Sequence, residues 1–182
     1  MPAEIIIVCA VVITLYFIFT YNHFIRLRNK SEEAFATMDA YLKKRWDLIP
    51  SLVEVVKAYA AHEQETMIRV VQARDIAKSS KGKMELEKGE KALTAGLTSL
   101  LALTEAYPDL KANENFIQLQ RQLDEIENDI LQSRKYFNAV IKVFNTQREL
   151  FPSSIVARVM KLDRQDYFVI TDSERKAVEV GL

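Results

Sequence analysis

The chain has 182 residues, and its 25 basic and 25 acidic side chains give a formal net charge of zero, which offers no electrostatic reason to expect a nucleic-acid-binding surface. Its four glycines and four prolines are few, so the composition favours long helices over a sheet or a disordered chain. Its single cysteine excludes an intrachain disulfide and a metal site built from several thiolates.

The first segment, residues 5–21, carries no charge, glycine or proline and is near the lower length limit for crossing a membrane as a helix. We interpret it as a membrane anchor. A cleaved signal peptide is the alternative, but such a peptide begins with basic residues and ends with small ones. Here residues 1–4 hold no Lys or Arg, and residues 16–21 are bulky. The basic side chains that follow predict an external N-terminus and a cytoplasmic remainder: they are His23, Arg26, Arg28 and Lys30.

No turn signal separates the anchor from the next helical pattern, so one continuous helix is predicted across this point. The pattern consists of Leu27, Ala34, Met38, Leu42 and Trp46. Pro50 lacks an amide donor and disfavours helical geometry at Ile49. We expect a tight turn there rather than a kink, with Asp47 capping the next helix. An unbroken helix over residues 27–79 would far outreach the later segment at 84–106.

Three more amphipathic helices are predicted at residues 52–79, 84–106 and 113–151. Gly89 and Gly96 disfavour the second of these, and Asn113 is expected to cap the third. Apart from Ser133, the third carries apolar residues at steps of three and four: Phe116, Leu119, Leu123, Ile126, Ile130, Phe137, Val140 and Phe144. Short connections between helices predict an antiparallel up-and-down four-helix bundle.

The C-terminal part leaves alternatives open. Residues 155–162 mix apolar and basic side chains, and they either lie on the bilayer or cap one end of the bundle. Residues 167–170 are β-prone with no intrachain sheet to join, so we hypothesise that they add to the edge of a neighbouring subunit or partner. The predicted class is all-α, with an anchor at 1–24, a four-helix bundle at 25–152 and an amphipathic segment with a tail at 153–182.

The sequence predicts no catalytic, cofactor-binding or metal-binding residue. His62 and Glu63 resemble the start of a zinc-protease motif, but Thr66 stands where the second histidine is needed. No Glu-x-x-His pair of the di-iron bundle type is present. We expect His62 to be a partly exposed helix residue rather than a metal ligand.

Two clusters of charged residues and one asparagine are interpreted as structural rather than functional. An acidic patch on the long helix is interpreted as a solvated face rather than a general acid and base; it comprises Asp124, Glu125, Glu127 and Asp129. A second cluster is expected to hold the turn at Pro50 through ion pairs, with contact to a partner as the alternative; it comprises Lys43, Lys44, Arg45 and Asp47. Asn128 is the candidate for a buried asparagine that fixes helix register.

The most distinctive run in the chain is Glu-Ala-Tyr-Pro-Asp-Leu-Lys-Ala-Asn-Glu-Asn-Phe at residues 105–116. It is accompanied by Arg-Trp-Asp-Leu-Ile-Pro-Ser-Leu-Val at 45–53 and Val-Lys-Ala-Tyr-Ala at 56–60. With these motifs, the region from about residue 20 to 152 resembles the LemA family of membrane-anchored bacterial proteins. The chain departs from the family pattern at Ser51, Ala58 and Phe137, where asparagine, glycine and tyrosine respectively are common.

The resemblance implies a helical bundle on one membrane anchor and no catalytic group. Some relatives are linked to membrane compartments such as magnetosomes and to membrane-stress proteases, which suggests scaffold or adaptor work. We therefore expect a single-pass protein of the cell membrane that is not an enzyme and needs no cofactor. Anchored in the lipid bilayer, it would act as a non-catalytic scaffold or interaction module that self-assembles at the membrane. The alternative is an adaptor or regulatory subunit of a membrane protease or other membrane enzyme, with the acidic patch as its working surface.

Overall fold

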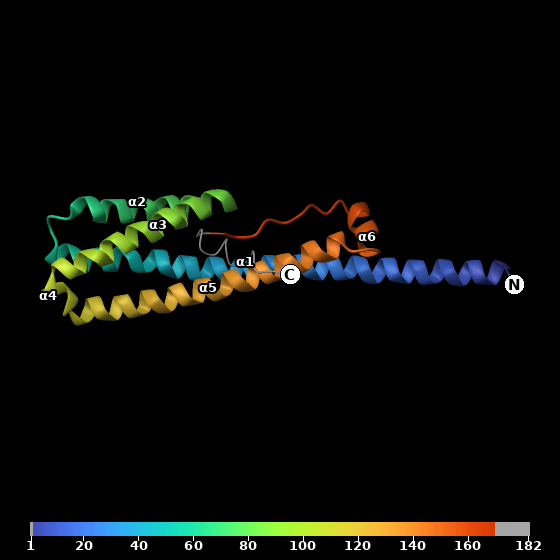
Figure 1. The fold of residues 1–182 in the computed structure, drawn as a ribbon, viewed down its shortest axis with the longest axis horizontal. Coiled ribbons are helices and arrows are strands. Elements are labelled where there is room, and N and C mark those ends of the chain that lie inside the picture. The colour runs from blue at the N-terminus through green and yellow to red at the C-terminus, as the bar shows by residue number, and fades with distance from the viewer. Residues whose placement is uncertain (1, 170–182) are drawn as a thin grey trace, which may run out of the picture. The chain divides into compact units, whose positions relative to one another are not determined.

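The computed structural model describes residues 2–169, and this part of the chain contains helices and no strand (Figure 1). The predicted all-α class is confirmed. The helices are α1 (Pro2–Tyr59), α2 (Gln64–Ser79), α3 (Lys83–Leu103), the short 3-10 helix η1 (Thr104–Ala106), α4 (Pro108–Lys111), α5 (Glu114–Glu149) and α6 (Ser153–Val159).

Helix α1 confirms that the apolar N-terminal run continues directly into the packed part of the chain. The expected turn at Pro50 is wrong, because α1 passes through this residue and ends at Tyr59. A proline inside a helix leaves the carbonyl four residues earlier, here that of Trp46, without an amide donor. Arg74 on α2 supplies the missing donor, since its Nε donates to the Trp46 carbonyl oxygen at 3.1 Å. The chain turns instead at residues 60–63.

The chain forms two compact units, and α1 and α5 each contribute a segment to both. Among the described residues, the first unit comprises residues 2–37 and Ser133–Tyr167, and the second comprises Met38–Gln132 and residues 168–169.

In the first unit α1 and α5 are antiparallel. Phe35 meets Phe137 edge to face with 5.8 Å between ring centroids, and Phe24 meets Phe144 in the same manner at 6.0 Å. The part of α1 around Phe24 therefore packs against the C-terminal end of α5. Helix α6 folds back onto this end of the unit and completes its core, which consists of Phe24, Leu27, Phe144, Val156 and Ala157.

The buried asparagine of the molecule is Asn145 rather than Asn128, whose side chain is exposed. Asn145 lies in the first unit and holds the chain after α6. Its Nδ2 donates to the Gln165 carbonyl at 2.8 Å, and its Oδ1 accepts the Gln165 amide at 3.0 Å. Because both side-chain atoms are used, this residue fixes an extended segment to a helix.

In the second unit α2 and α3 lie side by side, and glycine permits their close approach (Figure 1). A Cβ atom added at Gly89 would lie 2.6 Å from the Cα of Ala77. A Cβ atom at Gly96 would lie 3.2 Å from Cγ2 of Val70. The two glycines that disfavoured α3 by helix propensity are thus positions where α3 meets its neighbour.

The connections at one end of the second unit are fastened by polar side chains. The predicted cap is confirmed, because Asn113 Oδ1 accepts the Phe116 amide at 2.9 Å at the start of α5. The Tyr107 hydroxyl, at the start of α4, donates to Glu63 Oε1 at 3.3 Å. Partial burial, together with the negative charge of Glu63, raises the pKa of Tyr107 above its ordinary value.

The segment expected to form a strand with a partner packs within the chain instead, as far as it is described. Phe168 is buried, and the ammonium of Lys83 on α3 lies 5.9 Å from its ring centroid. The Val169 amide donates to Glu87 Oε1 at 3.1 Å, so α3 satisfies this backbone group. Residues 167–169 form no strand in this chain, the addition of this segment to a partner's edge stays a prediction, and Ile170 lies outside the described residues.

Candidate functional site

The second unit contains a buried charged pair, Arg45 on α1 and Glu90 on α3. Their side chains are 2% and 0% exposed, respectively. Charged residues are almost never buried to this extent without a partner. Each of them stands at a position of its helix where the helical spacing otherwise places buried apolar residues. Both side chains therefore point into the core, where they meet.

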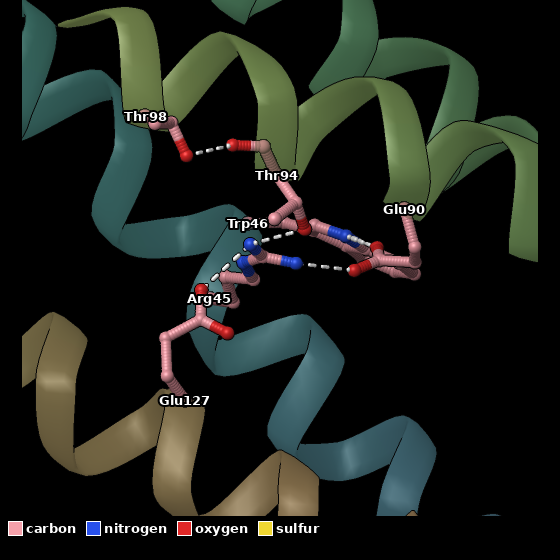
Figure 2. A network of polar contacts seen from close by, with 6 residues as sticks. All are labelled: Arg45, Trp46, Glu90, Thr94, Thr98 and Glu127. Atoms are coloured by element: carbon pink, nitrogen blue, oxygen red, sulfur yellow. Dashed lines mark hydrogen bonds and ion pairs between the residues drawn. The ribbon is translucent and has the colours of Figure 1, made fainter. Parts of the chain in front are cut away.

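Glu90 accepts two hydrogen bonds from adjacent residues of α1 (Figure 2). Arg45 Nη1 donates to Glu90 Oε2 at 2.7 Å, and the indole Nε1 of Trp46 donates to Oε1 at 2.6 Å. Both carboxylate oxygens are thereby engaged. Hydrogen bonds to a charged acceptor are stronger than neutral ones, and a buried carboxylate needs them to offset its lost hydration.

The other terminal nitrogen of Arg45 links α1 to α3 and α5. Arg45 Nη2 donates to Thr94 Oγ1 on α3 at 3.0 Å and pairs with Glu127 Oε1 on α5 at 2.6 Å (Figure 2). Within the described residues Arg45 Nε has no hydrogen-bond partner, so the guanidinium uses its two terminal nitrogens. We call Arg45, Trp46, Glu90, Thr94 and Glu127 the buried network.

The buried network is suited to holding helices in register. Each carboxylate oxygen of Glu90 accepts a hydrogen bond from α1, and the Arg45 guanidinium is enclosed by its partners. A pair of this kind contributes little net stability relative to an apolar core, but removal of one partner leaves the other charge buried and unpaired. Any slip of α3 along α1 would have that consequence, so the network opposes it.

The cluster predicted to hold a turn at Pro50 is divided by the helix. Arg45 points into the core, whereas Lys43 and Lys44 are exposed on α1. Lys43 pairs with Asp39 one turn earlier at 2.6 Å, and Asp47 is exposed. The cluster therefore holds no turn, and only Arg45 joins separate helices.

The acidic patch is also divided. Asp124 and Glu125 are exposed, as a solvated helix face requires. Glu127 lies at the edge of this face, because its side chain is 40% exposed while its carboxylate pairs with the buried Arg45. His62, the residue considered as a metal ligand, lies exposed between α1 and α2 rather than within a helix.

Sequence reasoning missed Glu90 altogether and placed Arg45 on the surface, although the sequence carries a signal for both. Glu90 interrupts a helical stripe whose other members are apolar and buried: Leu86, Leu93, Leu97 and Leu100. Arg45 interrupts a similar stripe on α1: Met38, Leu42, Ile49, Leu52 and Val56. Two opposite charges that each replace an apolar residue at helical spacing indicate a buried ion pair.

Comparison with known proteins agrees with the motifs in the sequence. The model of the LemA family matches residues 34–181, a range that includes the whole buried network. The chain is also similar to Protein LemA of Metamycoplasma hominis, with 26% identity over 165 residues that cover 87% of this chain and 72% of that protein. The match to the family model over most of the chain shows that this protein belongs to the LemA family.

Proposed function

We propose that this protein is a single-pass protein of the cell membrane whose helical part is a non-catalytic scaffold that assembles with copies of itself. The observation that carries the proposal is the uncovered apolar run at the start of α1. Among the described residues α1 is the one helix long and apolar enough to cross a membrane. Its side chains project without cover, as Ile5, Val12 and Phe19 illustrate at 65%, 58% and 68% exposure.

An exposed apolar surface of this length is unfavourable in water and favourable in lipid. A core helix of a soluble protein would bury the same residues, whereas here they are bare over several turns. The anchor interpretation accounts for this exposure, and the continuity of α1 then attaches the helical part directly to the membrane.

A non-catalytic role is supported by how the polar groups inside the second unit are used. Arg45 and Glu90 are engaged with each other and with neighbouring helices. Buried ionisable groups such as these are common at catalytic sites. Here they hold helices to one another, which supports a rigid helical scaffold as their role.

Self-assembly is supported by an apolar surface on α2. Ile68 and Ile76 are 53% and 57% exposed on the side of α2 that faces away from its buried residues, about two turns apart. Side chains of this kind lose their contact with water when a second copy covers them. The proposal assigns this surface to contact between copies.

The test measures the mass of the detergent-solubilised full-length chain by light scattering. The wild type is expected to be larger than a monomer, and the variant with Ile68→Ser and Ile76→Ser is expected to be smaller than the wild type. The variant with Asp124→Asn and Glu125→Gln is the control and should retain assembly. Glu127 is left intact because it pairs with Arg45. A monomeric wild type would refute self-assembly.

The adaptor function is the second candidate, and the exposure of Asp124 and Glu125 on α5 favours it. These two carboxylates are available to a basic surface on a membrane protease or another membrane enzyme. A stoichiometric complex with such an enzyme, lost on Asp124→Asn and Glu125→Gln but retained in the Ile68→Ser and Ile76→Ser variant, would establish the adaptor in place of the scaffold.

A further inference from the structure

We propose that the α5–α6 turn and the outer face of α6 form a second membrane contact, seated in the interfacial layer of a phospholipid bilayer beside the anchor. This inference rests on the proposed membrane anchoring. The contact surface, here called the α6 face, is apolar and exposed at 51%, 82%, 56% and 63%: it consists of Leu150, Phe151, Ile155 and Val159.

The packing of α5 against α1 sets the level of the α6 face. Phe35 meets Phe137 and Phe24 meets Phe144, so α5 approaches its end where α1 lies closer to its start. Both helices rise about 1.5 Å per residue. Continued to the end of α5 at Glu149, this register reaches the level of about residues 19–23 of α1, where the uncharged run ends, and Phe151 follows in the turn after α5.

The burial of side chains along α1 independently indicates that the first unit packs up to the end of the uncharged run. Thr20 is 9% exposed, whereas the described residues before it in α1 are all exposed. Packing within the first unit therefore reaches into the uncharged run and stops there. If the run lies in hydrocarbon, the part of the unit packed at its end lies at the membrane surface.

The two faces of α6 fit this position. Val156 and Ala157 pack on Phe24 and Leu27, which follow the uncharged run within about two turns of α1. The other face is apolar, and Arg158 beside it is exposed. A short helix with one apolar face and flanking basic residues is the type that binds at the lipid interface, where the basic groups meet anionic headgroups. Both alternatives predicted for this segment thus hold together: α6 caps the first unit and presents its other face to the bilayer.

Phe151 is the most exposed large apolar side chain among the described residues. The exposed residues of the anchor have lipid as their surroundings in the proposed function. Phe151 lies at the same level of α1 as the end of that anchor, and we assign it the same surroundings. A second protein copy is the competing occupant, and the experiment separates the two.

The experiment places one nitroxide label at a time on the full-length chain in phosphatidylcholine and phosphatidylglycerol vesicles. The native Cys9, which is exposed within the anchor, carries the reference label. The test labels use Phe151→Cys and, independently, Ile155→Cys, each with Cys9→Ala. The matched control is Val143→Cys with Cys9→Ala, because Val143 is 47% exposed on α5 in the same unit but lies beyond the end of the uncharged run.

Collision with lipid-soluble oxygen and with a water-soluble nickel chelate gives the surroundings of each label. The labels at positions 151 and 155 should collide preferentially with oxygen, and the label at 143 with the nickel chelate. If the Cys9 label is in lipid but those at 151 and 155 collide with nickel, the α6 face is refuted and the anchor stands. If 151 and 155 are shielded from both reagents, protein covers them and the inference is also wrong. A Cys9 label in water would instead refute the membrane anchoring itself.

Discussion

At the scale of residues, the buried network shows how a few polar groups can specify the register of long apolar helices. Leucine stripes pack in several registers with similar energy, because apolar contacts are not directional. Arg45 and Glu90 meet in one register only. The hydrogen bond from the Trp46 indole to the other oxygen of the same carboxylate constrains this register further. The network therefore contributes specificity, and removal of one of its members, which leaves the others buried without a partner, should lower stability strongly.

We expect Glu90→Gln to lower the free energy of unfolding by about 2–4 kcal/mol. Glutamine has one acceptor oxygen, so either Arg45 or Trp46 loses its partner in the core. Denaturant unfolding in detergent, followed by the fluorescence of the chain's single tryptophan, measures the loss directly at the site.

Asp39→Asn is the matched control, because it breaks the solvent-accessible pair between Asp39 and Lys43. An exposed pair one helical turn apart should change stability by less than about 0.5 kcal/mol. Equal losses in the two variants would show that burial of Glu90 has no special weight.

The contribution of the Arg74–Trp46 hydrogen bond to stability should depend on the presence of Pro50. Arg74→Met leaves the Trp46 carbonyl without a donor and should cost about 1–3 kcal/mol. In the Pro50→Ala background the restored amide donates to that carbonyl within α1, so Arg74→Met should cost much less. Thermal unfolding of the wild type, the two single variants and the double variant measures the coupling. Additive losses would mean that Arg74 acts through other contacts, such as its pair with Asp75.

At the scale of elements, the sequence predicts those features that depend on neighbouring residues. The cap at Asn113 and the continuity of α1 through residue 21 follow from local patterns. The passage of α1 through Pro50 does not, because the compensating donor lies on α2 and is brought there by tertiary packing. The sequence likewise gives the weak helix propensity of Gly89 but not the neighbour that requires it.

Substitution of the two glycines of α3 should separate helix propensity from packing. Alanine gains about 1 kcal/mol over glycine inside a helix. At Gly89 the new Cβ meets the backbone of Ala77 at 2.6 Å, so Gly89→Ala should destabilise despite this gain. At Gly96 the nearest atom is a side-chain methyl at 3.2 Å, so Gly96→Ala should be near neutral or mildly stabilising. Melting temperatures compare the two, and a stabilising Gly89→Ala would contradict the close approach.

At the scale of the whole molecule, α1 joins the apolar run to both compact units without a break. The buried network could be predicted only in part, because it too depends on tertiary packing. Arg45 and Glu90 each show as a charge within an apolar stripe, but their pairing depends on the register of α1 against α3, which tertiary packing sets and no local pattern reveals. Folding also brings α6, with its one basic residue Arg158, against the part of α1 that carries Phe24 and Leu27, where Arg158 adds to the basic residues that follow the run.

This arrangement makes the orientation in the membrane testable. Arg26 and Arg28 follow the uncharged run, and Arg158 of α6 lies in the same unit and is exposed. Positive charge at one end of a membrane helix favours retention of that end in the cytoplasm. In a Cys9→Ala background, Ala3→Cys should therefore react with a membrane-impermeant maleimide in intact spheroplasts. Val143→Cys should react only after permeabilisation, and the reverse pattern would place the helical units outside the cytoplasm.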